Sequence, residues 1–271
     1  MILGLLIGAS VAAASPAPAA PVSAGTLLKG AQHAIQAGRI DQARLMIARA
    51  AAAGAGAYQL HLVQGELAFA SGKYAEALAH YDRVSAGGQN TGPWLERAGI
   101  AALHLSDTKR AAPYISRATA DPYASWRAWN ACGVLADLQA DWAKADECYE
   151  RAAQLAPKEA APFNNRGWSL LLRSDWGEAL RYFERASELR GGSSRIARNL
   201  DMARAALGSD LPRRRAGESQ REWAERLNDA GVAAIILGDQ QKAVAAFTQA
   251  IDANEVWYQR AANNLEALTG R

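Results

Sequence analysis

The amino-acid sequence repeats with a fixed spacing of 34 residues over most of its length. Three series keep this spacing through four consecutive copies: Gly65, Gly99, Gly133 and Gly167; Ala77, Ala111, Ala145 and Ala179; and Tyr81, Ile115, Tyr149 and Phe183. A fixed period of roughly 20 to 50 residues is typical of an array of stacked structural units. The sequence therefore predicts an elongated solenoid rather than a single globular core.

Within one copy, the small and apolar residues have the spacing of two amphipathic helices. One helix face is predicted at Trp129, Cys132, Gly133 and Ala136, and a second at Ala145, Tyr149 and Ala152. A glycine inside a helix costs about 1 kcal/mol relative to alanine. The repeated glycine is therefore explained by a close approach of the two helices, with Gly133 opposite Ala145 and with Tyr149 filling the wider space.

This pattern of Gly, Ala, aromatic and Ala residues resembles the tetratricopeptide repeat (TPR). The resemblance implies an all-α solenoid of helix-turn-helix pairs, wound as a right-handed superhelix and closed by amphipathic capping helices. It also implies a concave groove, lined by the first helix of each pair, that binds a polypeptide. At the family's groove positions this sequence has Phe69, Ile100, Leu103, His104, Arg127, Asn130, Val134, Asn164, Trp168, Leu171 and Arg198. Trp168 remains open between a groove contact and a core residue.

Residues that start and interrupt helices fit the same division. An aspartate stands just before four of the predicted second helices, where its carboxylate can accept backbone N–H groups; these are Asp107, Asp141, Asp175 and Asp239. Ser219 and Glu222 have the spacing of a capping box. Pro113 lies inside a second helix, which is therefore expected to be kinked or to start late.

The repeat pattern divides the chain into four parts. Residues 1–24 precede the repeats, residues 25–208 form five repeats and a capping helix, residues 209–218 form a linker, and residues 219–271 form a further repeat with a final covering helix. The consecutive arginines 213–215 of the linker are interpreted as solvated rather than as a docking patch. The C-terminal part is either docked on the first array or hinged to it.

The first 24 residues are interpreted as an export signal. An apolar run from Ile2 to Ala14 is followed by a segment rich in proline and alanine, which is typical of a secretory leader. Small residues allow cleavage after Ala14 or after Ala24. The sequence thus predicts a periplasmic protein, or a membrane-tethered one if this segment is not cleaved.

Composition and spacing argue against several kinds of site. The net charge is +3, and the arginines are not concentrated in a nucleic-acid footprint. The four histidines lack ligand-like spacing, so we expect no metal and no other cofactor. Cys132 and Cys148 can meet across a helix pair, but we interpret them as small buried residues rather than as a disulfide.

No catalytic constellation is found, and no stretch outside the repeats is long enough for a catalytic domain. We therefore predict a non-enzymatic scaffold that binds a protein or peptide, with no small-molecule substrate. The alternatives are an oligomerising structural protein and an accessory subunit of an envelope enzyme or secretion complex. The chain also resembles the TPR protein of tight-adherence (Flp) pilus assembly, through its leader, its alanine-rich repeats and helices bearing Asn199-Leu200 and Asn264-Leu265. That resemblance implies a role in pilus or envelope assembly.

Overall fold

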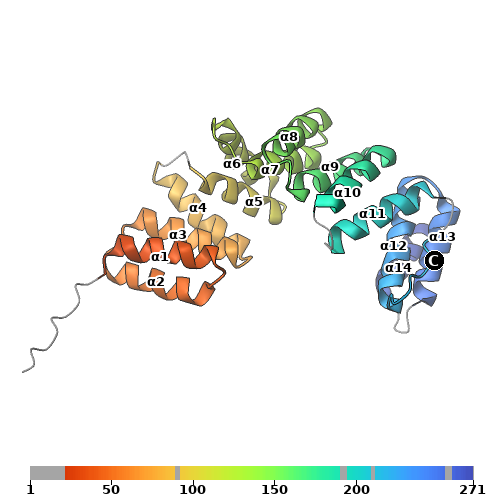
Figure 1. Ribbon diagram of the computed structural model, residues 1–271, viewed down its shortest axis with the longest axis horizontal. Coiled ribbons are helices and arrows are strands. Elements are labelled where there is room, and N and C mark those ends of the chain that lie inside the picture. The colour runs from red at the N-terminus through yellow and green to blue at the C-terminus, as the bar shows by residue number, and fades with distance from the viewer. Residues whose placement is uncertain (1–21, 89–91, 190–193, 209–210, 254–257, 271) are drawn as a thin grey trace, which may run out of the picture.

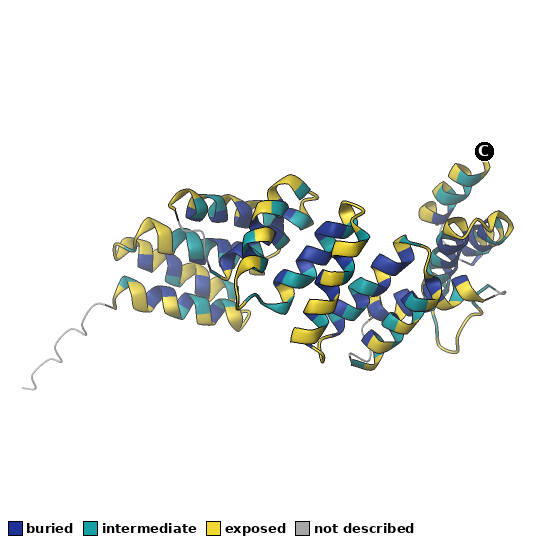
Figure 2. Cartoon of the chain, turned by 90° about the horizontal axis from the view of Figure 1, so that it is seen from above, coloured by how far each residue is buried: buried dark blue, intermediate teal, exposed yellow. Residues whose placement is uncertain are grey.

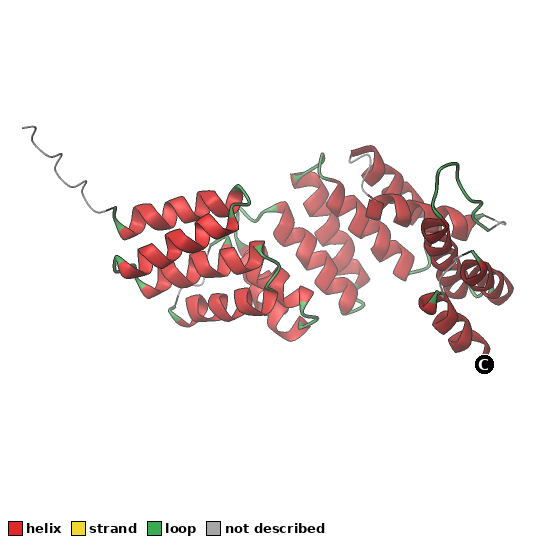
Figure 3. Ribbon diagram, turned by 90° about the horizontal axis from the view of Figure 1, so that it is seen from below, coloured by secondary structure: helices red, strands yellow, loops and turns green. Residues whose placement is uncertain are grey.

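The computed structural model describes residues 22–88, 92–189, 194–208, 211–253 and 258–270. These residues form helices and no strand (Figure 3). The helices are α1 (Ala24–Gln36), α2 (Ile40–Ala52), α3 (Ala57–Ala70), α4 (Tyr74–Ala86), α5 (Trp94–His104), α6 (Thr108–Ala120), α7 (Trp126–Leu138), α8 (Trp142–Leu155), α9 (Ala160–Leu172), α10 (Trp176–Leu189), α11 (Ser194–Leu207), α12 (Gln220–Ile236), α13 (Gln240–Asp252) and α14 (Gln259–Thr269). The predicted all-α solenoid is confirmed.

The helices are arranged as pairs stacked side by side in an arch (Figure 1). The first helix of each pair packs on its own second helix, and each second helix packs on the first helix of the next pair. Buried residues lie on the helix faces turned toward neighbouring helices, and exposed residues lie on the outer faces (Figure 2). The core is therefore a continuous series of small contacts, as expected for a solenoid.

The repeated glycine explains how closely the two helices of a pair pack. A Cβ atom placed on Gly133 would lie 2.5 Å from the Tyr149 ring, and one on Gly167 would lie 2.6 Å from the Phe183 ring. The prediction that glycine lies at the helix contact is confirmed. The residue opposite it is corrected, because the nearest atoms belong to the ring of Tyr149 and not to Ala145.

The predicted helix starts are observed at the side-chain level. The carboxylates of Asp107, Asp141 and Asp239 each accept a hydrogen bond from the backbone N–H three residues ahead. Ser219 and Glu222 form the predicted capping box. Of the two expectations for the helix that contains Pro113, a kink or a late start, the late start is wrong, because α6 already begins at Thr108 with Asp107 as its cap.

The two cysteines form a disulfide, which corrects the interpretation of them as separate buried thiols. Cys132 of α7 and Cys148 of α8 have Cα atoms 5.8 Å apart, a separation that a disulfide can span. Each cysteine directly precedes a member of the Gly133–Tyr149 contact. The bond therefore joins two helices at the point where their backbones already approach closely.

The C-terminal unit is docked on α11, which resolves the alternative left open by the sequence. Ala233 of α12 shares a buried cluster with Met202 and Ala206 of α11. The Lys242 ammonium of α13 donates to the backbone oxygens of Ala205 and Gly208 at the C-terminal end of α11. These carbonyls lack partners within their own helix, so the lysine completes the end of α11.

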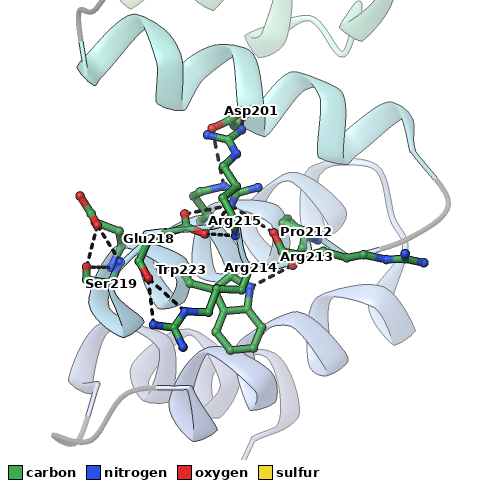
Figure 4. Close-up of polar contacts among 10 residues, drawn as sticks. Asp201, Pro212, Arg213, Arg214, Arg215, Glu218, Ser219 and Trp223 are labelled. Carbon is green, nitrogen blue, oxygen red and sulfur yellow. Dashed lines mark hydrogen bonds and ion pairs between the residues drawn. The ribbon is translucent and has the colours of Figure 1, made fainter.

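The segment before α12 takes part in this junction (Figure 4). Arg215 pairs with Asp201 of α11, the Arg214 guanidinium donates to the backbone oxygen of Glu218, and the Trp223 indole donates to the Pro212 backbone oxygen at 3.0 Å. The arginine side chains are exposed, as expected. Two of them are nevertheless more than solvated side chains, because Arg214 bonds within the segment to Glu218 and Arg215 joins the segment to α11.

A partly buried ion-pair network completes the junction. Arg226 of α12 lies 2.9 Å from the Glu218 carboxylate and 3.6 Å from that of Asp201. Burial alone would raise the pKa of Glu218, but the Arg215 backbone N–H and the Arg226 guanidinium outweigh it and hold that pKa below its ordinary value. The network holds the segment, α11 and α12 in one arrangement.

The interpretation of residues 1–24 as an export signal concerns residues that lie almost entirely outside the described ranges. The Ser23 hydroxyl accepts a hydrogen bond from Thr26 N at the start of α1. No helix in the described ranges is both long and apolar enough to cross a membrane.

Candidate peptide-binding surface

The predicted groove residues lie on the first helices of the pairs and on the unpaired helix α11. They are distributed over α3 (Phe69), α5 (Ile100, Leu103, His104), α7 (Arg127, Asn130, Val134), α9 (Asn164, Trp168, Leu171) and α11 (Arg198). Helices α3, α5, α7 and α9 contact one another in this order. The array thus brings residues from four helices onto one continuous surface, which we call the first-helix surface.

The Trp168 side chain is accessible on this surface and also packs against residues beneath it. The side chain is 39% exposed, and its ring meets the edge of Phe183 at a centroid distance of 6.4 Å. The Trp168 indole Nε1 lies 2.9 Å from the side-chain amide of Asn199. A large aromatic ring that is held in place and still half open can contact a ligand at a low cost in conformational entropy.

Two predicted groove residues are not accessible, and their assignment is corrected. Asn164 is 3% exposed and Leu171 is 2% exposed. Asn164 turns toward α11, where its amide is joined to that of Asn199 at 2.7 Å. Leu171 lies in the buried cluster with Trp176 and Phe183. Asn164 is thus covered by α11, and Leu171 belongs to the core that α9 shares with α10.

A row of amides crosses the inside of the array. Asn165 bonds to Asn130 at 3.1 Å and to Asn164 at 3.2 Å, and Asn164 bonds to Asn199. The row therefore links α7, α9 and α11 through side chains alone. Of these residues, Asn165 and Asn199 were missed as site residues. Buried amides need partners, so the row fixes the spacing of the first helices rather than offering all its groups to a ligand.

Two exposed leucines on the same surface were also missed. Leu138 and Leu172 are each 58% exposed and stand one helical turn after Val134 and Trp168, respectively. The 34-residue spacing could have identified them, because it relates His104, Leu138 and Leu172 just as it relates Ile100, Val134 and Trp168. The surface therefore carries two parallel rows of mainly apolar side chains.

Positive charge lies beside these rows. Arg127 is exposed, and its guanidinium lies 4.4 Å from the centroid of the Trp126 ring. Arg198 is also exposed, and its charge lowers the pKa of Asp229, which burial raises overall. Neither arginine forms an ion pair with another described residue. Both charges are therefore available to an acidic group on a partner.

At the N-terminal side of the surface, the side chains pack as an aromatic group. The His104 and Tyr74 rings stack with centroids 4.0 Å apart, and Phe69 meets Tyr74 edge to face at 5.6 Å. Leu103 packs against the neighbouring core without being fully buried. At this end of the surface, His104 and Phe69 thus pack on Tyr74 of a second helix.

The C-terminal end of α7 is fixed by a half-buried carboxylate. Asp137 accepts hydrogen bonds from the Tyr149 hydroxyl at 2.7 Å and from the Ser169 hydroxyl at 2.6 Å. Burial raises the pKa of Asp137 above its ordinary value, although both hydroxyls act in the opposite direction. These bonds join α7, α8 and α9 and so support the exposed Leu138 next to them.

Two histidines that are far apart in the sequence, His61 and His80, lie close together in the structure. The Nδ1 atoms of His61 on α3 and His80 on α4 lie 3.1 Å apart, which is a hydrogen bond that needs one proton between them. The described part of the chain contains no group of three or more metal-ligating side chains. The hydrogen bond joins α3 and α4.

This pair predicts a loss of stability in acid. Burial, and then the neighbouring His61, lower the pKa of His80 below its ordinary value of 6.5. Neutral His80 therefore stabilises the folded state fully above that value, and this contribution is lost as pH falls through the lower folded-state pKa. We expect the melting temperature to fall more steeply with acidification below pH 6.5 for the wild type than for His80→Gln. His33→Gln, at an exposed position, is the control and should follow the wild type.

Two family models, both described as the tetratricopeptide repeat, match residues 28–90 and residues 224–256, respectively. These two segments are tetratricopeptide repeats. The two matched segments lie at opposite ends of the array, which agrees with TPR pairs on both sides of α11. No curated protein sequence matches the chain.

Solved TPR structures share this fold. The crystal structure of PilW, described as a widely conserved type IV pilus biogenesis factor, has a TM-score of 0.59 at 16% identity, covering 89% of this chain and 98% of PilW. YrrB, described as a TPR protein with an unusual peptide-binding site, has a TM-score of 0.52 at 18% identity, covering 65% of this chain and 90% of YrrB. MamA from Desulfovibrio magneticus has a TM-score of 0.53 at 21% identity, covering 65% of this chain and 99% of that structure.

Proposed function

We propose that this TPR protein is a non-enzymatic scaffold that binds a partner polypeptide on the first-helix surface. The observation that carries the proposal is the exposure of Trp168, Leu138 and Leu172 in register on two adjoining helices. Large exposed apolar side chains in register mark an interaction site more strongly than scattered ones do. The fold supports a binding role, because TPR folds are typically non-enzymatic scaffolds.

The partner segment is expected to be mainly apolar with acidic flanks. The two rows can accept the nonpolar side chains of an extended segment or of an amphipathic helix. Arg127 and Arg198 favour acidic residues at its edges, and the Asn130 amide lies among the groups that can reach its backbone. Few charges pair across such a contact, so apolar burial should supply most of the affinity.

The test compares Trp168→Ala with Arg127→Ala. A partner is first captured from envelope extracts, its contacting segment is located by cross-linking, and the synthetic peptide is titrated by calorimetry. We expect Trp168→Ala to weaken binding by at least about 2 kcal/mol, or roughly 30-fold, as for a central aromatic contact. Arg127→Ala should cost less, and raised salt should weaken binding only modestly because screening acts on the few exposed charges.

Two further variants separate contact from folding. Leu172→Ser removes an exposed side chain of the same surface without touching the core, so it should also weaken binding. Tyr123→Ala removes an aromatic that is 94% exposed in the loop before α7, away from the first-helix surface, and should bind like the wild type. A steep salt dependence, with Trp168→Ala and Leu172→Ser equal to the wild type, would show that the surface works by charge.

We further propose that the protein is exported and acts in cell-envelope assembly, in a pilus system or a related machine. Three observations support this proposal: the apolar leader, the Cys132–Cys148 disulfide, which is stable in an oxidising compartment, and the shared fold with a type IV pilus biogenesis factor. The competing role is that of an accessory subunit of an envelope enzyme or secretion complex. Capture of a catalytic subunit by the first-helix surface would favour that competing role.

Export makes a prediction about the N-terminus. Cleavage after Ala24 would remove Ser23, the residue that caps α1, whereas cleavage after Ala14 would leave the cap in place. We therefore expect mass spectrometry of the native protein to find Ser15 as the first residue. An intact Met1 on protein recovered from the cytosol would contradict export.

A further inference from the structure

The C-terminal end of the array has an open apolar groove. Helix α14 packs on α13 and α12, but no later helix in the described residues packs on it as α13 packs on α12. A groove of about 770 Å³ lies between α13 and α14. Its apolar lining consists of Val244, Ile251, Ala262, Leu265 and Leu268. We call it the terminal groove.

The chain itself shows how such an end is covered. Helix α11 also lacks a second helix of its own, and α12 packs on it instead, with Arg226 pairing to Asp201. When α11 and α14 are aligned on their hydrogen-bonded asparagines, Asn199 and Asn264, Glu266 occupies the position that corresponds to Asp201. Glu266 lines the terminal groove, is exposed, and forms no ion pair with another described residue. Within the part of the chain that the structure describes, this end of the array therefore has an apolar groove and an acidic group that no basic helix covers.

The opposite end of the array offers a helix of matching character. On α2, Leu45, Ala48 and Ala52 form an exposed stripe, and Leu45 is 61% exposed. The corresponding position of the other second helices is occupied by Ala79, Pro113, Glu147, Arg181 and Ala245. Leu45 is thus the one large apolar side chain at this position among the described second helices. With Ala48 and Ala52, Leu45 gives α2 an exposed apolar stripe that a contact with another molecule can bury.

The charges of the two ends are complementary. The first pair, α1 and α2 with its connecting turn, carries Lys29, Arg39, Arg44 and Arg49 against the single acidic residue Asp41. The terminal groove has Glu266 at its wall, and α13 ends at a second acidic residue, Asp252, next to the lining residue Ile251. Arg260, the basic residue of α14, lowers the pKa of Asp229 and so faces α12 instead. Complementary charge of this kind orients two surfaces as they meet.

We propose that helix α2 of a second copy of this chain docks in the terminal groove, with Leu45 entering between α13 and α14 and with Arg49 near Glu266. The contact uses two different faces, one from each end of the array. Such a heterologous contact adds further copies head to tail unless the geometry closes a ring. It leaves the first-helix surface free, so it is independent of partner binding.

Sedimentation velocity of the full chain over a wide concentration range tests this proposal. We expect the wild type to shift to larger species as concentration rises. Leu45→Asp and Leu268→Asp should each weaken self-association by at least about tenfold, because each places a charge in an apolar contact. Leu155→Asp, at an exposed position outside both faces, should associate like the wild type.

Mixing the two defective variants is the decisive step. Leu45→Asp keeps an intact terminal groove and Leu268→Asp keeps an intact α2 stripe, so an equimolar mixture should form a dimer and nothing larger. Thr248→Arg, which changes an exposed groove residue of α13, replaces Leu268→Asp if the latter lowers the melting temperature. The proposal is overturned by a wild type that is monomeric throughout, by association that both variants leave unchanged, or by a mixture that stays monomeric.

Discussion

Phe183→Ala is expected to lower the free energy of unfolding by about 3–5 kcal/mol, the usual cost of removing a buried phenylalanine from a core. Phe183 is fully buried and fills the space that Gly167 leaves open between α9 and α10. Gly167→Leu disrupts the same contact, because the new leucine side chain would have to occupy the position of the Phe183 ring. Overpacking there should cost about 1–3 kcal/mol or more.

The combined volume of the side chains at positions 167 and 183, rather than the identity of either residue, should determine the free energy of unfolding. Gly167→Ala alone is expected to destabilise the protein, and adding Phe183→Leu should recover part of the loss because the smaller side chain makes room for the new methyl group. Gly177→Ala is the matched control, since a Cβ at Gly177 would meet no atom within 4 Å. Thermal and urea melts in which Gly167→Leu equals the wild type would remove this account of the repeated glycine.

Reduction of the Cys132–Cys148 bond is expected to have the second large effect on the stability of the protein. The cysteines are 16 positions apart in the sequence. In the chain-entropy model, a disulfide that closes a loop of about this length stabilises the folded protein by about 3 kcal/mol. We therefore expect reduced protein to melt at a lower temperature than oxidised protein. Cys132→Ala with Cys148→Ala should resemble the reduced wild type and should be insensitive to reductant.

The state of the bond can be checked directly. Under denaturing, non-reducing conditions, native protein should contain no alkylatable thiol and should be lighter than the fully reduced chain by two hydrogens. Two alkylatable thiols in protein recovered from the envelope would contradict the bond, and would also remove one of the three supports for export. Equal melting curves with and without reductant would show that the neighbouring Gly133–Tyr149 contact already fixes the helix pair.

The repeated positions allowed most of the fold to be predicted from sequence. Gly133, Gly167 and the aspartate caps act within one helix pair, so their spacing alone defines their environment. The partner of Gly133 was misjudged, because spacing does not show which of two residues on the opposite helix points at the glycine. The disulfide was missed for the same reason, since adjacency across a pair depends on the rotation of each helix about its axis.

The candidate surface was harder to predict, because accessibility depends on how successive pairs curve. Asn164 and Trp168 stand one turn apart on α9, yet Asn164 is buried against α11 while Trp168 remains partly open. Leu138 and Leu172 continue the same two rows and could have been found from the 34-residue spacing. The junction at Asp201 was beyond sequence reasoning, because its partners come from separate segments with no repeated position in common.

Helix α11 fixes the distance and direction between the two sets of TPR pairs. A partner long enough to touch both sets therefore makes its second contact as an intramolecular step, at an effective concentration determined by the protein and not by solution. Short peptides taken from either end of such a partner would each bind weakly. The intact segment would bind tightly, and loosening the contacts of Arg226 would reduce its affinity without changing that of either short peptide.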